Sequence, residues 1–244
     1  MNTAGTAFVT GAAVRVGRAI STALADAGFD LVLHANKSQQ ALHELADELA
    51  GTGRRVWVHT ADLSDAGETD ALGREVAAEH GVLDVVVHNA GIFELSPFAT
   101  TTWQQYRRML AVNLDAPFFL TRHLLPNLAA ARSPSVIMIG DVAADRVVPG
   151  YPHYTVSKAG LHALTRALAV ELAPGIRVNA VAPGTVAFPA DFGPRERERI
   201  LARIPLAAEG RVADVAEAVL FLATGPAYVT GHVLAVDGGR SALL

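Results

Sequence analysis

The residues best suited to chemistry are Tyr154 and Lys158, which lie four positions apart. They begin a segment whose leucines recur every three or four residues up to Leu172, which predicts a helix carrying both side chains on one face. An ammonium group beside a phenol favours the phenolate and so lowers the tyrosine pKa, as a general acid or base requires. The same spacing occurs by chance on many helices, so the pair alone leaves a purely structural interpretation open.

A carboxylate precedes this pair. Asp141 lies thirteen residues before Tyr154 and follows the apolar run 136–139. An ionised carboxylate repels a carbonyl oxygen but accepts N–H donors, so Asp141 favours a substrate that presents N–H groups beside a C=N bond. A protonated Asp141 would also be able to exchange a proton with Tyr154. The alternative is that Asp141 caps the turn after the strand.

The surrounding chain consists of short, solid apolar runs separated by helical patterns. The runs predict strands at 6–10, 31–35, 55–59, 83–88, 136–139, 176–181 and 233–236. Helices are predicted at about 18–27, 39–50 and 102–131, with another ending near residue 80 and one around Tyr154. Runs that are solid rather than alternating indicate a parallel sheet covered on both faces, an α/β doubly wound fold of about seven strands. No linker divides residues 1–244, so we expect a single domain.

Ligands of such a sheet bind beyond the carboxyl ends of its strands. The turn after the first predicted strand contains Gly11, Arg15, Val16 and Gly17 and leads into a helix. Unpaired backbone N–H groups at a helix N-terminus stabilise an anion, which predicts a phosphate site. Arg15 stands where a third glycine is expected, and its guanidinium adds a planar phosphate donor. The alternative is an ordinary strand-to-helix turn.

The turn after the second predicted strand indicates which dinucleotide is bound. NAD-binding units place an acid there to accept the ribose 2′-hydroxyl, but His34–Ser38 contains none. Lys37 supplies a cation and Asn36 and Ser38 supply donors, a set that would hold a 2′-phosphate. The sequence therefore predicts NADP(H) rather than NAD(H). Taken alone, Lys37 also fits a solvated surface charge.

The totals exclude several classes of partner. The 244 residues are 51% hydrophobic with a formal net charge of −4, which gives no indication of nucleic-acid binding. No apolar run is long enough to span a membrane, and the strand pattern from Thr6 leaves no room for a signal peptide. Without cysteines, the chain fits a reducing compartment, and we expect a cytoplasmic protein. The nine histidines show no ligand-like spacing, so no metal is expected.

Over nearly its whole length the sequence resembles the short-chain dehydrogenase/reductase family. The matching motifs are Thr10-Gly11-x5-Gly17, Ala61–Leu63, Asn89–Gly91, Asn113, Tyr154-x3-Lys158, Asn179, Pro183-Gly184 and Asp237–Gly239. Each motif is weak alone, but their order and spacing together are highly specific. The resemblance implies a Rossmann-type subunit, a homotetramer or homodimer, that moves hydride between a nicotinamide and a small-molecule substrate.

The resemblance also implies roles for individual residues. Tyr154 would donate the proton, and Lys158 would bind the nicotinamide ribose and lower the tyrosine pKa. Asn113 would hold a water in the proton path. The remaining cofactor contacts would be Asp62, Leu63, Asn89, Ala90, Gly91, Pro183 and Gly184.

Arg15 and Asp141 depart from the usual family pattern, and both departures are shared by the pteridine reductases. Phe93 lies at the offset of their pterin-stacking aromatic, whereas Gly91 stands where they carry a serine. The resemblance implies a substrate site of Arg15, Phe93, Asp141 and Tyr154, covered by a lid near 185–210. In the lid the alternating charges of Arg195–Arg199 suit a solvated helix. One alternative is a carbonyl reductase for a 3-oxoacyl, sugar or quinone substrate, in which Asp141 is a tolerated variant. The other is an NADP-binding sensor or scaffold without turnover.

Overall fold

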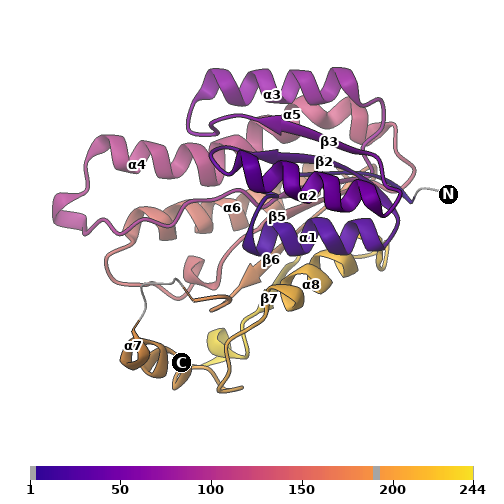
Figure 1. Cartoon of the computed structure of the whole chain (residues 1–244). Helices are drawn as coiled ribbons and strands as arrows, with labels where there is room; N and C mark the ends of the chain where they lie inside the picture. Colours follow the sequence, from indigo (N-terminus) through magenta and orange to yellow (C-terminus); the bar gives the residue numbers. More distant parts are fainter. Residues whose placement is uncertain (1–3, 189–192, 244) are drawn as a thin grey trace.

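The computed structural model describes residues 4–188 and 193–243, which form one doubly wound parallel sheet (Figure 1). The strand order is β3-β2-β1-β4-β5-β6-β7, so it reverses direction between β1 and β4. Every neighbouring pair is parallel. The strands are β1 Gly5–Val9, β2 Phe29–Ala35, β3 Val56–Thr60, β4 Val85–His88, β5 Ser135–Ile139, β6 Arg177–Pro183 and β7 Val233–Val236. The predicted fold class is confirmed.

Helices cover both faces of the sheet (Figure 1). The helices are α1 Arg15–Asp26, α2 Gln39–Gly51, α3 Ala66–Glu79, α4 Trp103–Leu110, α5 Ala116–Ala129, α6 Pro152–Glu171, α7 Pro194–Leu201 and α8 Val212–Thr224. One buried apolar cluster joins the sheet to α1, α2 and α8, and a second joins it to α3, α5 and α6. A π-helical turn, Ala111–Asp115, connects α4 to α5, and 3-10 turns occupy Phe98–Thr100, Val142–Ala144 and Arg240–Ala242.

The two buried clusters explain why the strands appear in the sequence as continuous apolar runs. In β4, Val85 and Val87 belong to the α1 side, whereas Val86 belongs to the α5 side. Successive side chains of a strand point to opposite faces, so a sheet covered on both faces favours apolar residues at most positions of each strand. All seven residues of β2 are buried for the same reason.

The helices differ from the sequence-based expectation in three places. The first begins at Arg15 rather than near residue 18, and the π-helical turn divides the predicted helix 102–131 in two. Helix α8 was not predicted, because Ala218–Leu222 is apolar at every position and shows no polar face. The charged run Arg195–Arg199 does lie in a helix, α7, but residues 189–192 of the predicted lid lie outside the described residues.

No helix among the described residues combines the length and apolarity needed to cross a membrane.

Candidate active site

A cavity of about 540 Å³ opens at the carboxyl ends of the strands, beside the point where strand order reverses. It lies within the size range of small-molecule sites. All predicted cofactor and substrate residues line it: Gly11, Arg15, Val16, Gly17, Asn36, Lys37, Ser38, Asp62, Leu63, Asn89, Ala90, Gly91, Phe93, Asp141, Tyr154, Lys158, Pro183 and Gly184. Of the predicted site residues, only Asn113 is not part of the lining that the described residues form.

The glycine turn is held closed by contacts that only glycine permits. A Cβ on Gly17 would lie 2.0 Å from the carbonyl oxygen of Gly11. That oxygen accepts a hydrogen bond of 2.9 Å from the Asn89 side chain, which also bonds the Thr10 carbonyl at 3.0 Å. The Thr10 hydroxyl in turn accepts from the backbone N–H of Asn89. The turn after β1 is therefore locked to the end of β4, and Thr10 was missed as a positioning residue.

His34 lies buried beneath the same turn. The backbone N–H of Gly11 donates to its Nδ1 at 3.4 Å, so Nε2 carries the proton and donates to the Ala61 carbonyl at 3.1 Å. Burial lowers the pKa of His34 to about 4, which keeps the ring neutral. His34 thus joins the ends of β1, β2 and β3 as a positioning residue, although sequence reasoning gave it no role of its own.

Arg15 adopts a backbone conformation suited to glycine. Its φ is +50°, in the left-handed region that glycine enters without a Cβ penalty. This explains why a glycine is expected at the position. The Arg15 guanidinium donates to the carbonyl of Ala187, so it links the glycine turn to the segment after β6, where the predicted lid begins.

The second turn places its polar groups along one side of the cavity. Lys37 and Ser38 are exposed at its rim, and Asn36 hydrogen-bonds the Asp62 side chain. Hydrogen bonds from Ser64 hold the pKa of Asp62 below its usual value. Arg108 also lines the cavity, a position that sequence reasoning missed because α4 follows no strand end directly.

The candidate catalytic groups meet at the end of β5. The Tyr154 hydroxyl donates to Asp141 Oδ2 at 2.6 Å, and Asp141 Oδ1 accepts from the Ala143 N–H at 2.7 Å. Lys158 Nζ donates to the Ile139 carbonyl at 2.8 Å. Tyr154 and Lys158 are 6% and 5% exposed. Asp141 therefore caps the turn that follows the strand and also accepts the hydrogen bond of the Tyr154 hydroxyl.

The predicted electrostatics of the pair are wrong for this arrangement. Burial raises the pKa of Tyr154 well above its ordinary value, and the charge and hydrogen bond of Asp141 raise it further. Burial lowers the pKa of Lys158 to about 8, against an opposing effect of Asp141. The ammonium of Lys158 bonds a carbonyl while the carboxylate of Asp141 contacts the phenol directly, so Asp141 adds to the effect of burial on the Tyr154 pKa. Tyr154 is accordingly a neutral phenol in this arrangement.

Asn113 lies in the π-helical turn and is 1% exposed. Its side chain accepts from the N–H of Ile92 at 2.9 Å and donates to the Ile92 carbonyl and to Ser157 Oγ, both at 3.1 Å. A Cβ on Gly91 would lie 3.3 Å from Asn113 Oδ1 and 3.6 Å from Lys158 Nζ. Asn113 thus fixes the backbone beside Lys158, and its predicted water contact stays a prediction.

Phe93 forms an aromatic wall at the mouth of the cavity. Its ring stacks on Tyr151 at a centroid distance of 4.1 Å and meets the edge of Tyr154 at 4.7 Å. The side chain remains 47% exposed. Tyr151 was not predicted as part of this wall, because the sequence before Pro152 indicated a loop.

Comparison with known proteins identifies the family. A family model described as enoyl-(acyl carrier protein) reductase matches residues 11–241. The chain belongs to the short-chain dehydrogenase/reductase family. Among curated relatives, it is 37% identical to "Short-chain dehydrogenase/reductase eriH" of Hericium erinaceus, over 98% of this chain and 99% of that protein. It is 34% identical to a Staphylococcus aureus 3-oxoacyl-[acyl-carrier-protein] reductase FabG, over 96% of each.

Two solved structures of similar chains contain the predicted type of cofactor. A blue fluorescent protein from a metagenomic library, in complex with NADPH, aligns with a TM-score of 0.89, 36% identity and 98% coverage of both chains. FolM alternative dihydrofolate reductase 1 from Brucella canis, complexed with NADP, aligns with a TM-score of 0.91 and 29% identity, over 99% of this chain and 95% of that one. The predicted likeness to pteridine-type reductases is supported in part, since the sequence relatives include a 3-oxoacyl reductase.

Proposed function

We propose that this short-chain dehydrogenase/reductase is an NADPH-dependent reductase of a C=N bond in a dihydropterin or related imine. Tyr154 is the proton donor and Asp141 assists. The observation that carries the proposal is the 2.6 Å hydrogen bond from the Tyr154 hydroxyl to Asp141, at the floor of the cavity. The similarity to FolM, complexed with NADP, supports it.

The cavity fits NADP(H). The Gly11–Gly17 turn lines the cavity and leads into the N-terminus of α1, which suits a pyrophosphate. Lys37 and Ser38 would hold the 2′-phosphate, where an acid would repel it. Tyr154 and Lys158 would contact the nicotinamide ribose. When bound, NADPH supplies the hydride.

The protein itself supplies the proton, from Tyr154, and the positive charge of Lys158 that stabilises the resulting phenolate. A substrate N–H that donates to Asp141 takes the place of the Tyr154 hydroxyl there and frees that hydroxyl to face the C=N nitrogen. As hydride reaches the carbon, the O–H bond of Tyr154 breaks, an N–H bond forms and the C=N bond becomes single. The phenolate left behind is stabilised by the Lys158 ammonium, whose Nζ lies 5.8 Å from the Tyr154 ring centroid.

A carbonyl reductase is the second candidate. The FabG relative at 34% identity favours it, and Asp141 has a structural use of its own as acceptor of the Ala143 N–H. In that reaction the substrate oxygen would accept from Tyr154. A nucleotide sensor without turnover is the weaker alternative, because Tyr154, Lys158 and Asn113 are all present and buried together.

The deciding experiment measures NADPH oxidation with 7,8-dihydrobiopterin, dihydrofolate and a panel of ketones. We expect the wild type to turn over a pterin and Asp141→Ser to lose most of that rate while still binding NADPH. Ketone turnover alone, kept or improved in Asp141→Ser, would establish the carbonyl reductase instead. No turnover with any substrate, despite NADPH binding, would favour the sensor.

We further infer that residues 1–244 act as one domain with a substrate lid near 185–210, and that the chain forms a homotetramer or homodimer. The exposed aromatic side chains of Trp103, Phe118 and Phe119, on α4 and α5, support an interface there. Sedimentation of the purified protein tests the oligomer.

A further inference from the structure

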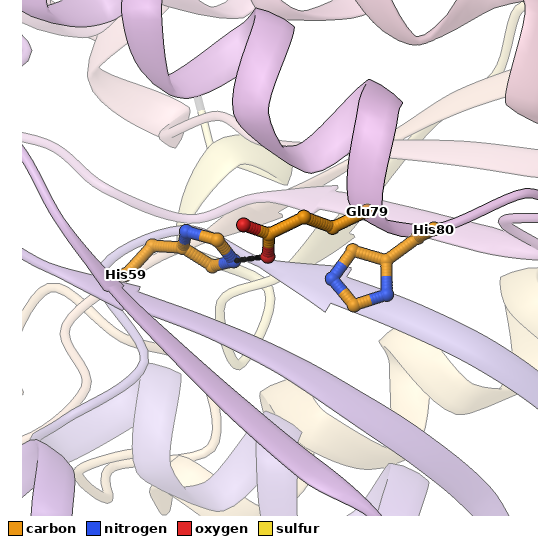
Figure 2. A group of neighbouring side chains, drawn as sticks. All are labelled: His59, Glu79 and His80. Carbon is orange, nitrogen blue, oxygen red and sulfur yellow. Dashed lines mark ion pairs between the residues drawn. The ribbon is translucent and has the colours of Figure 1, made fainter.

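Three potential metal ligands converge between β3 and the end of α3 (Figure 2). His59 projects from β3, Glu79 is the last residue of α3 and His80 is its C-cap. One ligand atom from each lies within 4.8 Å of the others. His59 Nε2 is 3.6 Å from the Glu79 carboxylate, and Figure 2 shows a ring nitrogen of each histidine facing that carboxylate.

The two imidazole rings are largely shielded from solvent, and each has a nitrogen that makes no hydrogen bond among the described residues. The side chain of His59 is 9% exposed, and His80 is 6% exposed. Nε2 of both rings lacks a hydrogen-bond partner among the described residues, and His59 Nε2 has only the longer ion-pair contact with Glu79. A buried polar atom without a partner is costly and calls for an explanation. The edge-to-face contact of Trp57 with His80, at a centroid distance of 4.8 Å, fixes the second ring in place.

We propose that His59, Glu79 and His80 bind a Zn²⁺ ion. Two imidazole nitrogens and one carboxylate are a recurrent zinc set that leaves the fourth position to water. Imidazole also selects zinc over magnesium and calcium, which prefer oxygen ligands. The set was not visible in the sequence, because His59 and His80 lie 21 positions apart and only the packing of α3 on β3 brings them together.

The geometry allows the three ligands to close on an ion. In a tetrahedral zinc site with ligands at about 2.0–2.2 Å, two ligand atoms lie about 3.3–3.6 Å apart. The present spread of up to 4.8 Å therefore needs a contraction of about 1.2–1.5 Å. Glu79 Oε2 already lies 3.6 Å from His59 Nε2, and the Glu79 side chain, which is 55% exposed, can move toward the ion. Glu75 Oε2 lies 4.0 Å from His59 Nδ1, which suits a carboxylate that orients a metal-bound histidine through its other nitrogen.

The site lies apart from the cavity, because none of the three ligands is among its described lining residues. The ion would join β3, the edge strand in the sheet order, to the end of α3. We therefore expect bound Zn²⁺ to stabilise the fold, whatever reaction the cavity carries out.

The test uses tag-free protein stripped with a chelator and titrated with Zn²⁺ against a chromogenic competitor. We expect one equivalent to bind, and Glu79→Gln to weaken that binding at least about tenfold. At a hundred times the Kd, Zn²⁺ should raise the Tm by about 5–10 °C. The matched control is the double variant His43→Ala/Glu44→Gln, which removes an adjacent exposed His–Glu pair on α2 and should change nothing.

Two results would overturn the proposal. One is a wild-type protein that binds no Zn²⁺ under these conditions. The other is Zn²⁺ binding that Glu79→Gln and the His43/Glu44 control leave equally strong, which identifies adventitious binding only. If Glu79→Gln does not fold by circular dichroism, His80→Gln carries the same expectation. The readouts are metal affinity and Tm, so they are independent of the proposed reductase activity.

Discussion

Gly17→Ala tests whether the glycine turn is built around the absence of a single methyl group. The new Cβ would lie 2.0 Å from the Gly11 oxygen, whereas ordinary contact begins at 3.4 Å, so the two must separate by about 1.4 Å. That movement removes the 2.9 Å hydrogen bond from Asn89. Overpacking costs about 1–3 kcal/mol and the hydrogen bond about 1 kcal/mol, which together correspond to a Tm loss of about 5–15 °C.

The control is Gly51→Ala, because nothing lies within 4 Å of a Cβ placed on this exposed glycine at the end of α2. Alanine is the better helix residue by about 0.5–1 kcal/mol, so the Tm should rise by about 1–4 °C. Differential scanning fluorimetry measures both variants, and NADPH fluorescence titration should show weaker binding in Gly17→Ala alone. A Gly17→Ala protein that melts and binds NADPH like the wild type would refute the account of the turn.

Two further predictions concern charge. Lys37→Glu should weaken NADPH roughly tenfold to a hundredfold, because an attraction to a phosphate dianion becomes a repulsion. NADH should change by no more than about threefold, and equal losses in a fluorescence titration would contradict the 2′-phosphate assignment. Burial lowers the pKa of His34 to about 4 and that of His88 to about 3, from 6.5. Below pH 6.5 the unfolded chain therefore binds more protons than the folded chain. As the pH is lowered toward about 4, these two histidines should reduce the free energy of unfolding by about 2.7 kcal/mol per pH unit. Urea unfolding of His88→Gln should show a slope about 1.4 kcal/mol per unit smaller, and an unchanged slope would contradict the burial argument.

Much of the fold could be predicted because its signals are local. The solid apolar run of β5 specifies a strand buried on both faces, and the absence of an acid in His34–Ser38 is visible without coordinates. The glycine turn could be located in the same way. The φ of +50° at Arg15 could not, because a residue other than glycine gives no indication of a left-handed backbone.

The features that were missed depend on contacts between distant segments. The pKa of Tyr154 is raised because tertiary packing buries the phenol and places Asp141 nearer to it than the Lys158 ammonium. Spacing along α6 shows that Tyr154 and Lys158 share a face, but not that the ammonium turns to the carbonyl of Ile139. His59, Glu79 and His80 likewise come together only through tertiary packing, so their spacing in the sequence does not indicate a metal site.

Under the proposed function, the Tyr154–Asp141 bond also determines which substrates suit the site. A ketone has only an acceptor oxygen, so to use the Tyr154 proton it must compete with a carboxylate, and hydrogen bonds to charged acceptors are the stronger kind. It would also leave the negative charge of Asp141 facing its own oxygen. A substrate with an N–H beside its C=N nitrogen satisfies Asp141 while it takes the Tyr154 proton, so neither polar group loses its partner. Replacement of Asp141 by serine removes the charged acceptor for that N–H, which is why the proposal expects the pterin rate to fall in that variant.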